Sequence, residues 1–346
     1  MAETLLIRAD ANTRIGTGHV MRSLALAQAW RASGGEAIFL HAADSMALSA
    51  RLQEESFQVL DRTFQAGSQE DAEQTALLAR NVGAAWVVLD GYHFGPVVQK
   101  ILRRLGCQVL LIDDLGQEDC CEADVILNQN IHARHSLYPA STHGTNVLLG
   151  TNYALLRREF LDFSHRERHI GSVPQALVTL GGSDPQNVTL KVVRALSAMI
   201  CSGLPLRAKV LVGAANPYWK ELRQANSNPE SLELMTSSSK MPDLMAWADV
   251  AVAAGGSTCW ELAFMGLPSL LVVLADNQTA LAEGMAEQGA AINLGWHAAV
   301  DEVLIVRALS ELLADPARQA EMSRNARRLV DGRGADRVVS VLRQRK

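Results

Sequence analysis

The chain has few cysteines, no excess of positive charge, no long hydrophobic run and no low-complexity tract. Its 346 residues include 32 Lys and Arg against 37 Asp and Glu, which gives a formal net charge of -5. A chain without a basic field is not expected to bind nucleic acid or an anionic membrane surface. The composition, 48% hydrophobic and 20% charged, is that of a globular protein long enough for two domains.

The five cysteines show neither a CxxC pair nor a histidine at the spacing of a zinc site. Cys120 and Cys121 are adjacent and cannot simply pair with each other, so a reducing compartment fits this cysteine usage best. The longest apolar run, at 270–275, is far shorter than a membrane span. The opening residues MAETLLIRAD do not resemble a signal peptide. We therefore expect a cytoplasmic protein without a membrane segment.

The stretch 253–278 carries the strongest local pattern in the chain. A short apolar strand at 248–253 runs into Gly255 and Gly256, and apolar residues at helical spacing follow directly. The two glycines allow a sharp turn and leave no side chain between the helix N-terminus and a ligand. Ser257 and Thr258 are favourable cap residues. The first amides of such a helix can bind an anion such as a diphosphate.

Polar side chains after this turn are expected to contact hydroxyl groups of a ligand bound there. Glu261 lies one helical turn further on, within reach of a ribose hydroxyl pair attached to the diphosphate. Asp276, Asn277 and Gln278 follow the next apolar strand and are expected at the same sheet edge, where they would recognise hydroxyl groups. Many α/β proteins contain a strand, two glycines and a helix without a ligand there, so this pattern needs support from the rest of the chain.

The N-terminal half begins with the same succession of strand, glycine loop and helix. An apolar strand at 5–7 is followed by a loop with Gly16 and Gly18, and a helix is predicted from His19 to about residue 30. This is the start of a doubly wound domain, in which ligands bind at the carboxyl ends of strands. No third glycine follows, so the loop is not a dinucleotide fingerprint and NAD binding is not expected.

Alternating strands and helices continue to about residue 130, which predicts a parallel sheet covered on both faces. Strands predicted at 86–90 and 109–113 end in polar residues, Asp90 and Tyr92 after the first and Asp113 and Asp114 after the second. The two adjacent carboxylates either contact a substrate or form a turn with solvated side chains. The polar run 128–130 after the next strand likewise lines a cleft or makes a turn.

We predict a domain boundary near residue 165, in a charged run that follows a polar stretch. A second doubly wound pattern follows, with glycines before a helix at Gly181 and Gly182 and again at Gly255 and Gly256. The predicted domains are 1–165 and 166–346, and the last helix is left free to pack on the first domain. Two such α/β domains facing across a cleft are typical of nucleotide-sugar enzymes, in which one domain holds the nucleotide and the other brings catalytic groups to the sugar.

Four segments together resemble one family of UDP-sugar hydrolases. They read IRADANTRIGTGHVMRSLALA, YALLRREF, LGGSDPQN and AGGSTCWELAFMGLPSLLVVLADNQ, in the family's order, between Ile7 and Gln278. The family is that of the UDP-2,4-diacetamido-2,4,6-trideoxy-β-L-altropyranose hydrolases (PseG) of pseudaminic acid biosynthesis. It is related to the N-acetylglucosaminyltransferase of peptidoglycan synthesis. The resemblance implies a GT-B fold with two doubly wound Rossmann-like domains, and release of UDP by water attack at the anomeric carbon without metal or cofactor.

The resemblance also assigns roles to residues. The family's essential histidine falls on His19, the expected general base, and a helix N-terminus keeps such a ring neutral and able to accept a proton. Asp10, at the end of the preceding strand, is expected to orient this imidazole or to hold the water. The expected substrate contacts are Gly255, Gly256, Ser257 and Glu261 for UDP, Asn277 and Gln278 for the sugar or the diphosphate, Tyr92 for the sugar, Gly182 at the cleft floor, Ser183 for a phosphate, and Gly16 and Gly18 beside His19.

The leaving group explains why so few catalytic groups are visible. A terminal phosphate has a last pKa of about 6, so it needs charge stabilisation more than a proton, and the helix amides after Gly256 can supply it. Cleavage at phosphorus would instead call for a metal held by carboxylates, and no acidic cluster of that kind stands out in the sequence.

Three other functions remain open. A GT-B glycosyltransferase would move the sugar of a UDP-amino sugar to an acceptor, a hydrolysing 2-epimerase would remove the proton at C2, and a non-catalytic protein would only sense the UDP-sugar. The expected partner in each case is a small-molecule UDP-sugar. We expect a monomer, because a GT-B cleft needs no second chain.

Overall fold

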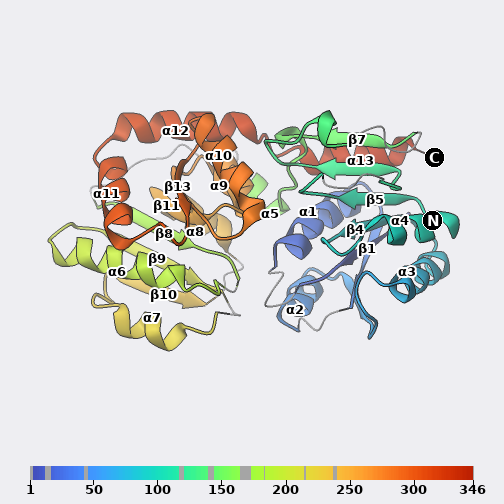
Figure 1. Cartoon of the computed structure of the whole chain (residues 1–346), viewed down its shortest axis with the longest axis horizontal. Helices are drawn as coiled ribbons and strands as arrows, with labels where there is room; N and C mark the ends of the chain where they lie inside the picture. The colour runs from blue at the N-terminus through green and yellow to red at the C-terminus, as the bar shows by residue number, and fades with distance from the viewer. Residues whose placement is uncertain are drawn as a thin grey trace. The chain divides into compact units, whose positions relative to one another are not determined.

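The computed structural model describes residues 3–11, 17–42, 46–116, 121–138, 144–163, 173–182, 184–213, 216–236 and 240–345, except for the side chains of 46–48. The chain divides into two compact units, one formed by Met1–Arg158 together with Gly332–Lys346 and the other by Glu159–Asp331 (Figure 1). The division falls after residue 158, whereas the sequence pattern placed it near 165. The last residues of the chain return to the first unit, where the red helix of Figure 1 lies among green and cyan strands.

The first unit contains a seven-stranded parallel sheet in the order β3-β2-β1-β4-β5-β6-β7. Its strands are β1 (Thr4–Ala9), β2 (Glu36–His41), β3 (Gln58–Asp61), β4 (Ala84–Asp90), β5 (Val109–Ile112), β6 (Val125–Asn128) and β7 (Asn146–Leu149). Its helices are α1 (Gly18–Ala32), α2 (Met46–Glu54), α3 (Gln69–Asn81), α4 (Pro96–Arg104) and α13 (Gly334–Gln344), with short 3-10 helices η1 (His135–Leu137) and η2 (Thr151–Tyr153). The sequence pattern does not reveal the edge strands β3 and β7, because each begins with a polar residue and is mostly not buried, whereas the equally short β5 and β6 are fully buried.

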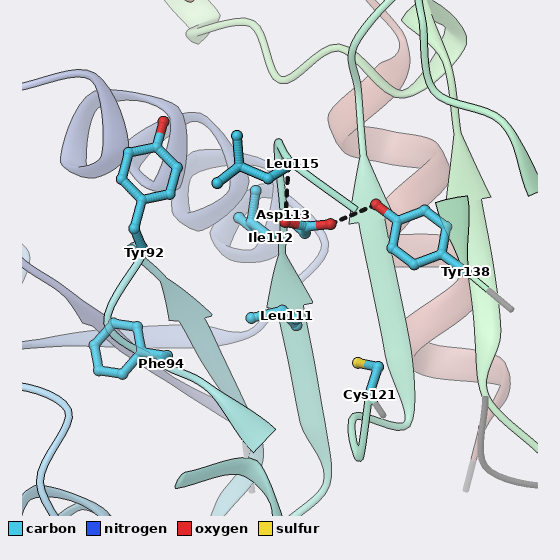
Figure 2. A pocket seen from close by; sticks show the side chains of 9 residues that line it. Tyr92, Phe94, Leu111, Ile112, Asp113, Leu115, Cys121 and Tyr138 are labelled. Carbon is cyan, nitrogen blue, oxygen red and sulfur yellow. Dashed lines mark hydrogen bonds between the residues drawn. The ribbon is translucent and has the colours of Figure 1, made fainter. Parts of the chain in front are cut away.

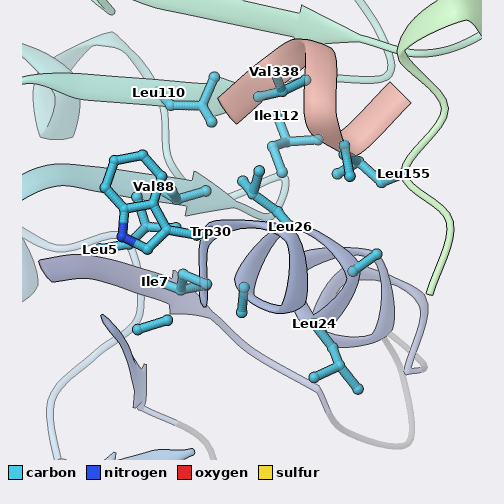
Figure 3. Close-up of a cluster of buried hydrophobic side chains, with 14 of the residues drawn as sticks. Leu5, Ile7, Leu24, Leu26, Trp30, Val88, Leu110, Ile112, Leu155 and Val338 are labelled. Atoms are coloured by element: carbon cyan, nitrogen blue, oxygen red, sulfur yellow. The ribbon is translucent and has the colours of Figure 1, made fainter. Parts of the chain in front are cut away.

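Both faces of this sheet are buried, as a parallel sheet requires. Leu5 and Ile7 of β1 belong to one core, whereas Leu6 between them belongs to the other. On the first face Trp30 of α1 and Val338 of α13 pack with the strands (Figure 3). Because α1 packs against both the sheet and α13, most of its side chains are buried, including polar ones. Those polar side chains must find partners inside the protein.

The second unit contains a six-stranded parallel sheet in the order β10-β9-β8-β11-β12-β13. Its strands are β8 (Gln175–Thr179), β9 (Arg207–Val212), β10 (Leu232–Thr236), β11 (Val250–Ala254), β12 (Ser269–Val273) and β13 (Ile292–Trp296). Its helices are α6 (Val188–Cys201), α7 (Trp219–Ala225), α8 (Met241–Trp247), α9 (Thr258–Met265), η3 (Asp276–Gln278), α10 (Thr279–Glu287), α11 (Glu302–Leu313) and α12 (Pro316–Leu329), and the short α5 (Arg158–Leu161) spans the division between the units. Across the parts of the chain that the structure describes, every helix is too short or too polar to span a bilayer.

The strand orders locate where ligands are expected in each unit. The order reverses between β1 and β4 in the first sheet and between β8 and β11 in the second. Ligands of doubly wound sheets bind outside the carboxyl ends of the strands at such a reversal. The residues to consider are therefore those that follow β1 and β4 in one unit and β8 and β11 in the other.

Candidate functional site

His19 lies in the first turn of α1, shortly after β1. Its side chain is 7% exposed, and its Nδ1 lies 2.7 Å from Oδ1 of Asp90 at the end of β4. Nη2 of Arg22 also approaches Nδ1, but at 3.2 Å. The shorter contact with a carboxylate, which can only accept, assigns the proton to Nδ1. Nε2 is then the ring nitrogen with a lone pair, and this is the atom that can take a proton from a substrate.

Asp90 is completely buried and is held by donors on α1. Arg22 donates from Nε to Oδ2 at 2.8 Å and from Nη2 to Oδ1 at 2.6 Å, and Ser23 Oγ donates to Oδ2 at 3.0 Å. Burial opposes ionisation of this carboxyl group, yet the charges and hydrogen bonds of Arg22 and His19 lower its pKa to about 2. Asp90 therefore stays a carboxylate at neutral pH, oriented toward the imidazole.

Arg22 joins this pair to a second carboxylate. Its Nη1 donates to both oxygens of Asp114, at 2.7 and 2.9 Å, and Asn130 Nδ2 donates to Oδ1 of Asp114 at 2.9 Å. Burial works against ionisation of Asp114 as well, but the charge of Arg22 keeps its pKa below the ordinary value. The loops after β4, β5 and β6 thus contribute to one buried polar network around His19.

The adjacent carboxylates therefore do more than make a solvated turn. Asp113 does accept from the amides of Leu115 and Gly116, as a turn residue would. Asp114, by contrast, is 13% exposed and ion-paired with Arg22. The hydroxyl of Tyr92 also reaches Asp114 Oδ2 at 3.3 Å, and its ring stands edge-on to the imidazole of His19 at 4.8 Å between centroids. Tyr92, expected at the sugar, is thus brought next to His19.

Asp10 does not hold His19, contrary to the expectation that it orients the imidazole. Its Oδ1 pairs with Nη1 of Arg8 at 2.7 Å and accepts from the amide of Ala42 at 2.8 Å, while its Oδ2 lies 3.1 Å from Nε2 of His93. Against the effect of burial, these partners keep the pKa of Asp10 well below its usual range. The physical reason is the sheet order: β4 lies beside β1, so Asp90 is delivered to the start of α1.

In the second unit the turn from β11 to α9 has an open helix start. Ser257 occupies the N-cap without a side-chain hydrogen bond, and no hydrogen bond to another described residue uses the backbone amides of Ser257 and Thr258. Gly255 packs against Gln278, because a Cβ there would lie 3.2 Å from both the Cβ and the backbone oxygen of Gln278. Oε1 of Gln278 accepts from the amide of Leu274 at 2.9 Å, which fixes this carboxamide beside the glycines.

At the other glycine turn, a side chain of the turn itself binds the first amides of the following helix. Asp184 is buried and accepts from the amides of Val188 and Thr189, at 2.9 and 2.7 Å, at the start of α6. An anion would have to displace this carboxylate. Gly182 serves packing instead, since a Cβ on Gly213 would meet the Gly182 backbone oxygen at 2.1 Å. Of the two turns in this unit, the one after β11 is the candidate anion site.

The remaining expected residues fall in three groups. Gly18 is the first residue of α1, next to His19. Glu261 lies in the first turn of α9 and is partly buried, and Asn277 is exposed in η3. Gly16 and Ser183 lie outside the described residues. Within the described ranges, no group of three or more His, Cys, Asp or Glu side chains is arranged to hold a metal ion.

Arg22 and Asp90 are the residues whose roles the sequence pattern missed. Arg22 lies one helical turn after His19 on a helix that is otherwise largely apolar, and that spacing was the available signal. Asp90 was noted at a strand end, but its partner could not be identified without the strand order.

The chain resembles known proteins in both sequence and structure. Residues 176–338 match the model of the glycosyltransferase family 28 C-terminal domain. The chain is 24% identical to the spore coat polysaccharide biosynthesis protein SpsG of Bacillus subtilis, over 97% of this chain and 96% of that protein. It is 22% identical to the UDP-2,4-diacetamido-2,4,6-trideoxy-beta-L-altropyranose hydrolase of Campylobacter jejuni, over 82% of this chain and 97% of that protein.

A shorter match is to a transferase. The chain is 32% identical to the UDP-N-acetylglucosamine--N-acetylmuramyl-(pentapeptide) pyrophosphoryl-undecaprenol N-acetylglucosamine transferase of Stutzerimonas stutzeri, over 48% of this chain. That match spans 47% of the transferase, about half its length.

Solved structures agree on the fold. MurG of Acinetobacter baumannii superposes with a TM-score of 0.66 at 17% identity over 99% of both chains. MnaA of S. aureus, solved with UDP, gives 0.69 at 13% identity over 97% of this chain and 95% of that one. A protein of Listeria monocytogenes described as a UDP-N-acetylglucosamine 2-epimerase gives 0.71 at 13% identity over 99% and 96%. The chain is thus a GT-B fold protein, as the resemblance implied, and its match to the glycosyltransferase family 28 C-terminal model lies mainly in the second unit.

Proposed function

We propose that the protein hydrolyses UDP-2,4-diacetamido-2,4,6-trideoxy-β-L-altropyranose to UDP and the free sugar. The observation that carries this proposal is the His19–Asp90 pair. A buried, ionised carboxylate fixes Nδ1 as the protonated nitrogen and leaves Nε2 as a base at the carboxyl edge of the first sheet. The likeness over 82% of the chain to the Campylobacter jejuni hydrolase supports the substrate.

In the proposed step, Nε2 of His19 takes a proton from a water molecule as its oxygen attacks the anomeric carbon. The bond from that carbon to the phosphate oxygen breaks, and its electron pair leaves with UDP. Asp90 stabilises the positive charge that develops on the imidazole, in the manner of other carboxylate–histidine pairs. Arg22 and Ser23 hold Asp90 in place through this step. No general acid is required, because the diphosphate leaves as a stable anion.

We assign UDP to the second unit. The unpartnered amides at the start of α9 would bind the diphosphate, with Gly255 and Gly256 allowing its close approach. Glu261 would accept from the ribose hydroxyls, and Asn277 and Gln278 would contact the sugar or the diphosphate. The match to a glycosyltransferase family 28 C-terminal domain and the fold shared with UDP-bound MnaA support this assignment.

The test is turnover of the UDP-sugar without an acceptor, in water enriched in oxygen-18. Attack at carbon puts the label in the sugar and none in UDP. His19→Asn, which can still donate to Asp90 but has no Nε2, is expected to lower kcat by about a thousandfold while UDP affinity is unchanged. If UDP and free sugar do not appear, hydrolysis is wrong.

A GT-B glycosyltransferase that uses a UDP-amino sugar is the second candidate. The observation in its favour is the family 28 C-terminal domain itself, together with the match to the Stutzerimonas stutzeri transferase. The same His19–Asp90 pair would then take its proton from an acceptor hydroxyl. UDP release that requires an added acceptor would support this alternative.

A further inference from the structure

A cavity of about 130 Å³ lies in the first unit, and Figure 2 shows the side chains that line it. It is lined by nine described residues: Gly91, Tyr92, Phe94, Leu111, Ile112, Asp113, Leu115, Cys121 and Tyr138. Tyr92 connects it to the site, because the same ring contacts the imidazole of His19 and lines the cavity. At about 30 Å³ per molecule of liquid water, the cavity has room for a group of about four non-hydrogen atoms.

The polar end of the cavity offers an acceptor. Oδ2 of Asp113 accepts from the hydroxyl of Tyr138 at 2.6 Å and from the amide of Gly116 at 2.8 Å, and Oδ1 accepts from the amide of Leu115 at 3.0 Å. Tyr138 keeps its proton, because burial and the Asp113 charge raise its pKa. A carboxylate has about four lone-pair positions, and these three bonds leave one on Oδ1.

The rest of the lining excludes an anion. Phe94, Leu111 and Ile112 form apolar walls, and none of the nine lining residues is Lys or Arg. Arg22, the nearby cation of the His19 network, is already ion-paired with Asp90 and Asp114. A phosphate is therefore disfavoured, whereas an N–H donor with a short apolar end fits both the acceptor and the walls.

We propose that this cavity holds one acylamino group of the substrate sugar, with its N–H on Asp113 and its methyl group against the apolar walls. This rests on the proposed function for the identity of the sugar. The group has four non-hydrogen atoms, and the cavity has room for a group of that size. The cavity then makes the protein select an acetamido sugar over the same sugar with a hydroxyl group at that carbon.

The first test is binding, so that its outcome does not depend on turnover. Saturation-transfer NMR with the free 2,4-diacetamido sugar is expected to show one acetyl methyl signal much stronger than the other in the unsubstituted protein. Cys121→Met, whose larger side chain fills part of the cavity, is expected to abolish that difference. The matched control is Cys107→Met, because Cys107 packs against the same core but is not among the cavity residues. Equal methyl signals in the unsubstituted protein, or a difference that persists in Cys121→Met, would overturn the proposal.

The second test is selectivity. For UDP-sugars that differ only in acetamido against hydroxyl at one carbon, kcat/KM is expected to favour the acetamido compound by about fiftyfold. Leu115→Phe, which fills the cavity from a partly exposed position, is expected to reduce that ratio to within threefold, with UDP affinity unchanged. UDP release at equal rates from both compounds would contradict the assignment of the cavity but not the proposal of hydrolysis. Absence of UDP release from either would refute hydrolysis, and the NMR comparison then decides the cavity.

Discussion

His19 depends on a carboxylate 71 positions away in the sequence. That carboxylate has no contact with solvent and depends in turn on Arg22, which is on the same helix as His19. The imidazole, Asp90 and Arg22 therefore form a hydrogen-bonded cluster in which each side chain positions the others. Removing a single member of such a buried network leaves the others incompletely paired, and that costs more than an isolated hydrogen bond.

Asp90→Asn is expected to lower kcat by about a thousandfold or more. The amide can present an N–H to Nδ1 and so move the ring proton to Nε2, where the base is needed. UDP affinity is expected to stay within twofold, since the assigned UDP site is in the other unit. Steady-state kinetics and calorimetric titration with UDP measure both. Asp61→Asn, on an exposed carboxylate of β3, is the control, and a kcat for Asp90→Asn within threefold of it would contradict this role.

Stability is expected to fall in acid partly through Asp90. Its pKa in the folded protein is about 2, below the ordinary 3.8. A lowered pKa contributes stability that is present above the unfolded value and is lost as the pH falls through the folded value. The difference corresponds to about 2 kcal/mol, lost between about pH 5 and pH 2. Urea unfolding at a series of pH values measures this, and Asp90→Asn should show a smaller acid loss. Equal acid losses in the two proteins would argue against it.

At the scale of elements, the two glycine turns of the second unit differ in whether a side chain binds the backbone amides at the start of the following helix. The start of α6 is capped by Asp184, whereas the backbone amides of Ser257 and Thr258 at the start of α9 have no partner among the described residues. Gln278 in η3 closes one side of the open turn. The affinity for a diphosphate therefore depends on how α9 and η3 are held together.

Gly255→Val is expected to weaken UDP binding at least tenfold. A Cβ at this position already lies 3.2 Å from Gln278, so a branched side chain must displace η3 from the turn. Calorimetric titration with UDP provides the measurement. Asp184→Ala is the matched control at the other turn, where loss of the α6 cap should cost about 1–2 kcal/mol of stability and leave UDP affinity unchanged. A tenfold loss of UDP affinity in Asp184→Ala with none in Gly255→Val would reverse the assignment.

At the scale of the whole molecule, the chain ends in the unit in which it begins. Val338 and Leu342 of α13 are buried in the core of the first unit, and the backbone oxygen of Leu342 accepts from the indole of Trp86 at 3.1 Å. The helix thus completes the core behind α1, although the second unit lies between them in the sequence. The family 28 match covers mainly the second unit and describes little of this arrangement.

Leu342→Ala is expected to destabilise the first unit by about 2–5 kcal/mol, through lost burial and the cavity left behind. Ser340→Ala, on the exposed face of the same helix, is expected to change stability by less than about 0.5 kcal/mol. Scanning calorimetry with and without UDP separates the units, since the ligand should raise only the transition of the second. A Leu342→Ala protein in which only the UDP-sensitive transition shifts would show that α13 stabilises the other unit.

Local patterns in the sequence determined a large part of this protein. Alternating apolar strands and helices predicted two doubly wound α/β domains, and glycines before helices identified the turns at Gly18 and Gly255. The position of His19 directly after such a loop, together with the family resemblance, predicted that it is the base. These features repeat over a few residues, so neighbouring side chains carry the signal.

The tertiary structure decided which groups work together. Asp90 rather than Asp10 meets His19 because β4, not the chain immediately before the loop, delivers a carboxylate to the start of α1. Asp184 closes the glycine turn before α6, whereas the glycine turn before α9 is open. The last helix, α13, joins the first unit. Short-range periodicity does not encode these contacts. They depend on the order of strands in the sheet and on which side chain the fold places beside a buried donor.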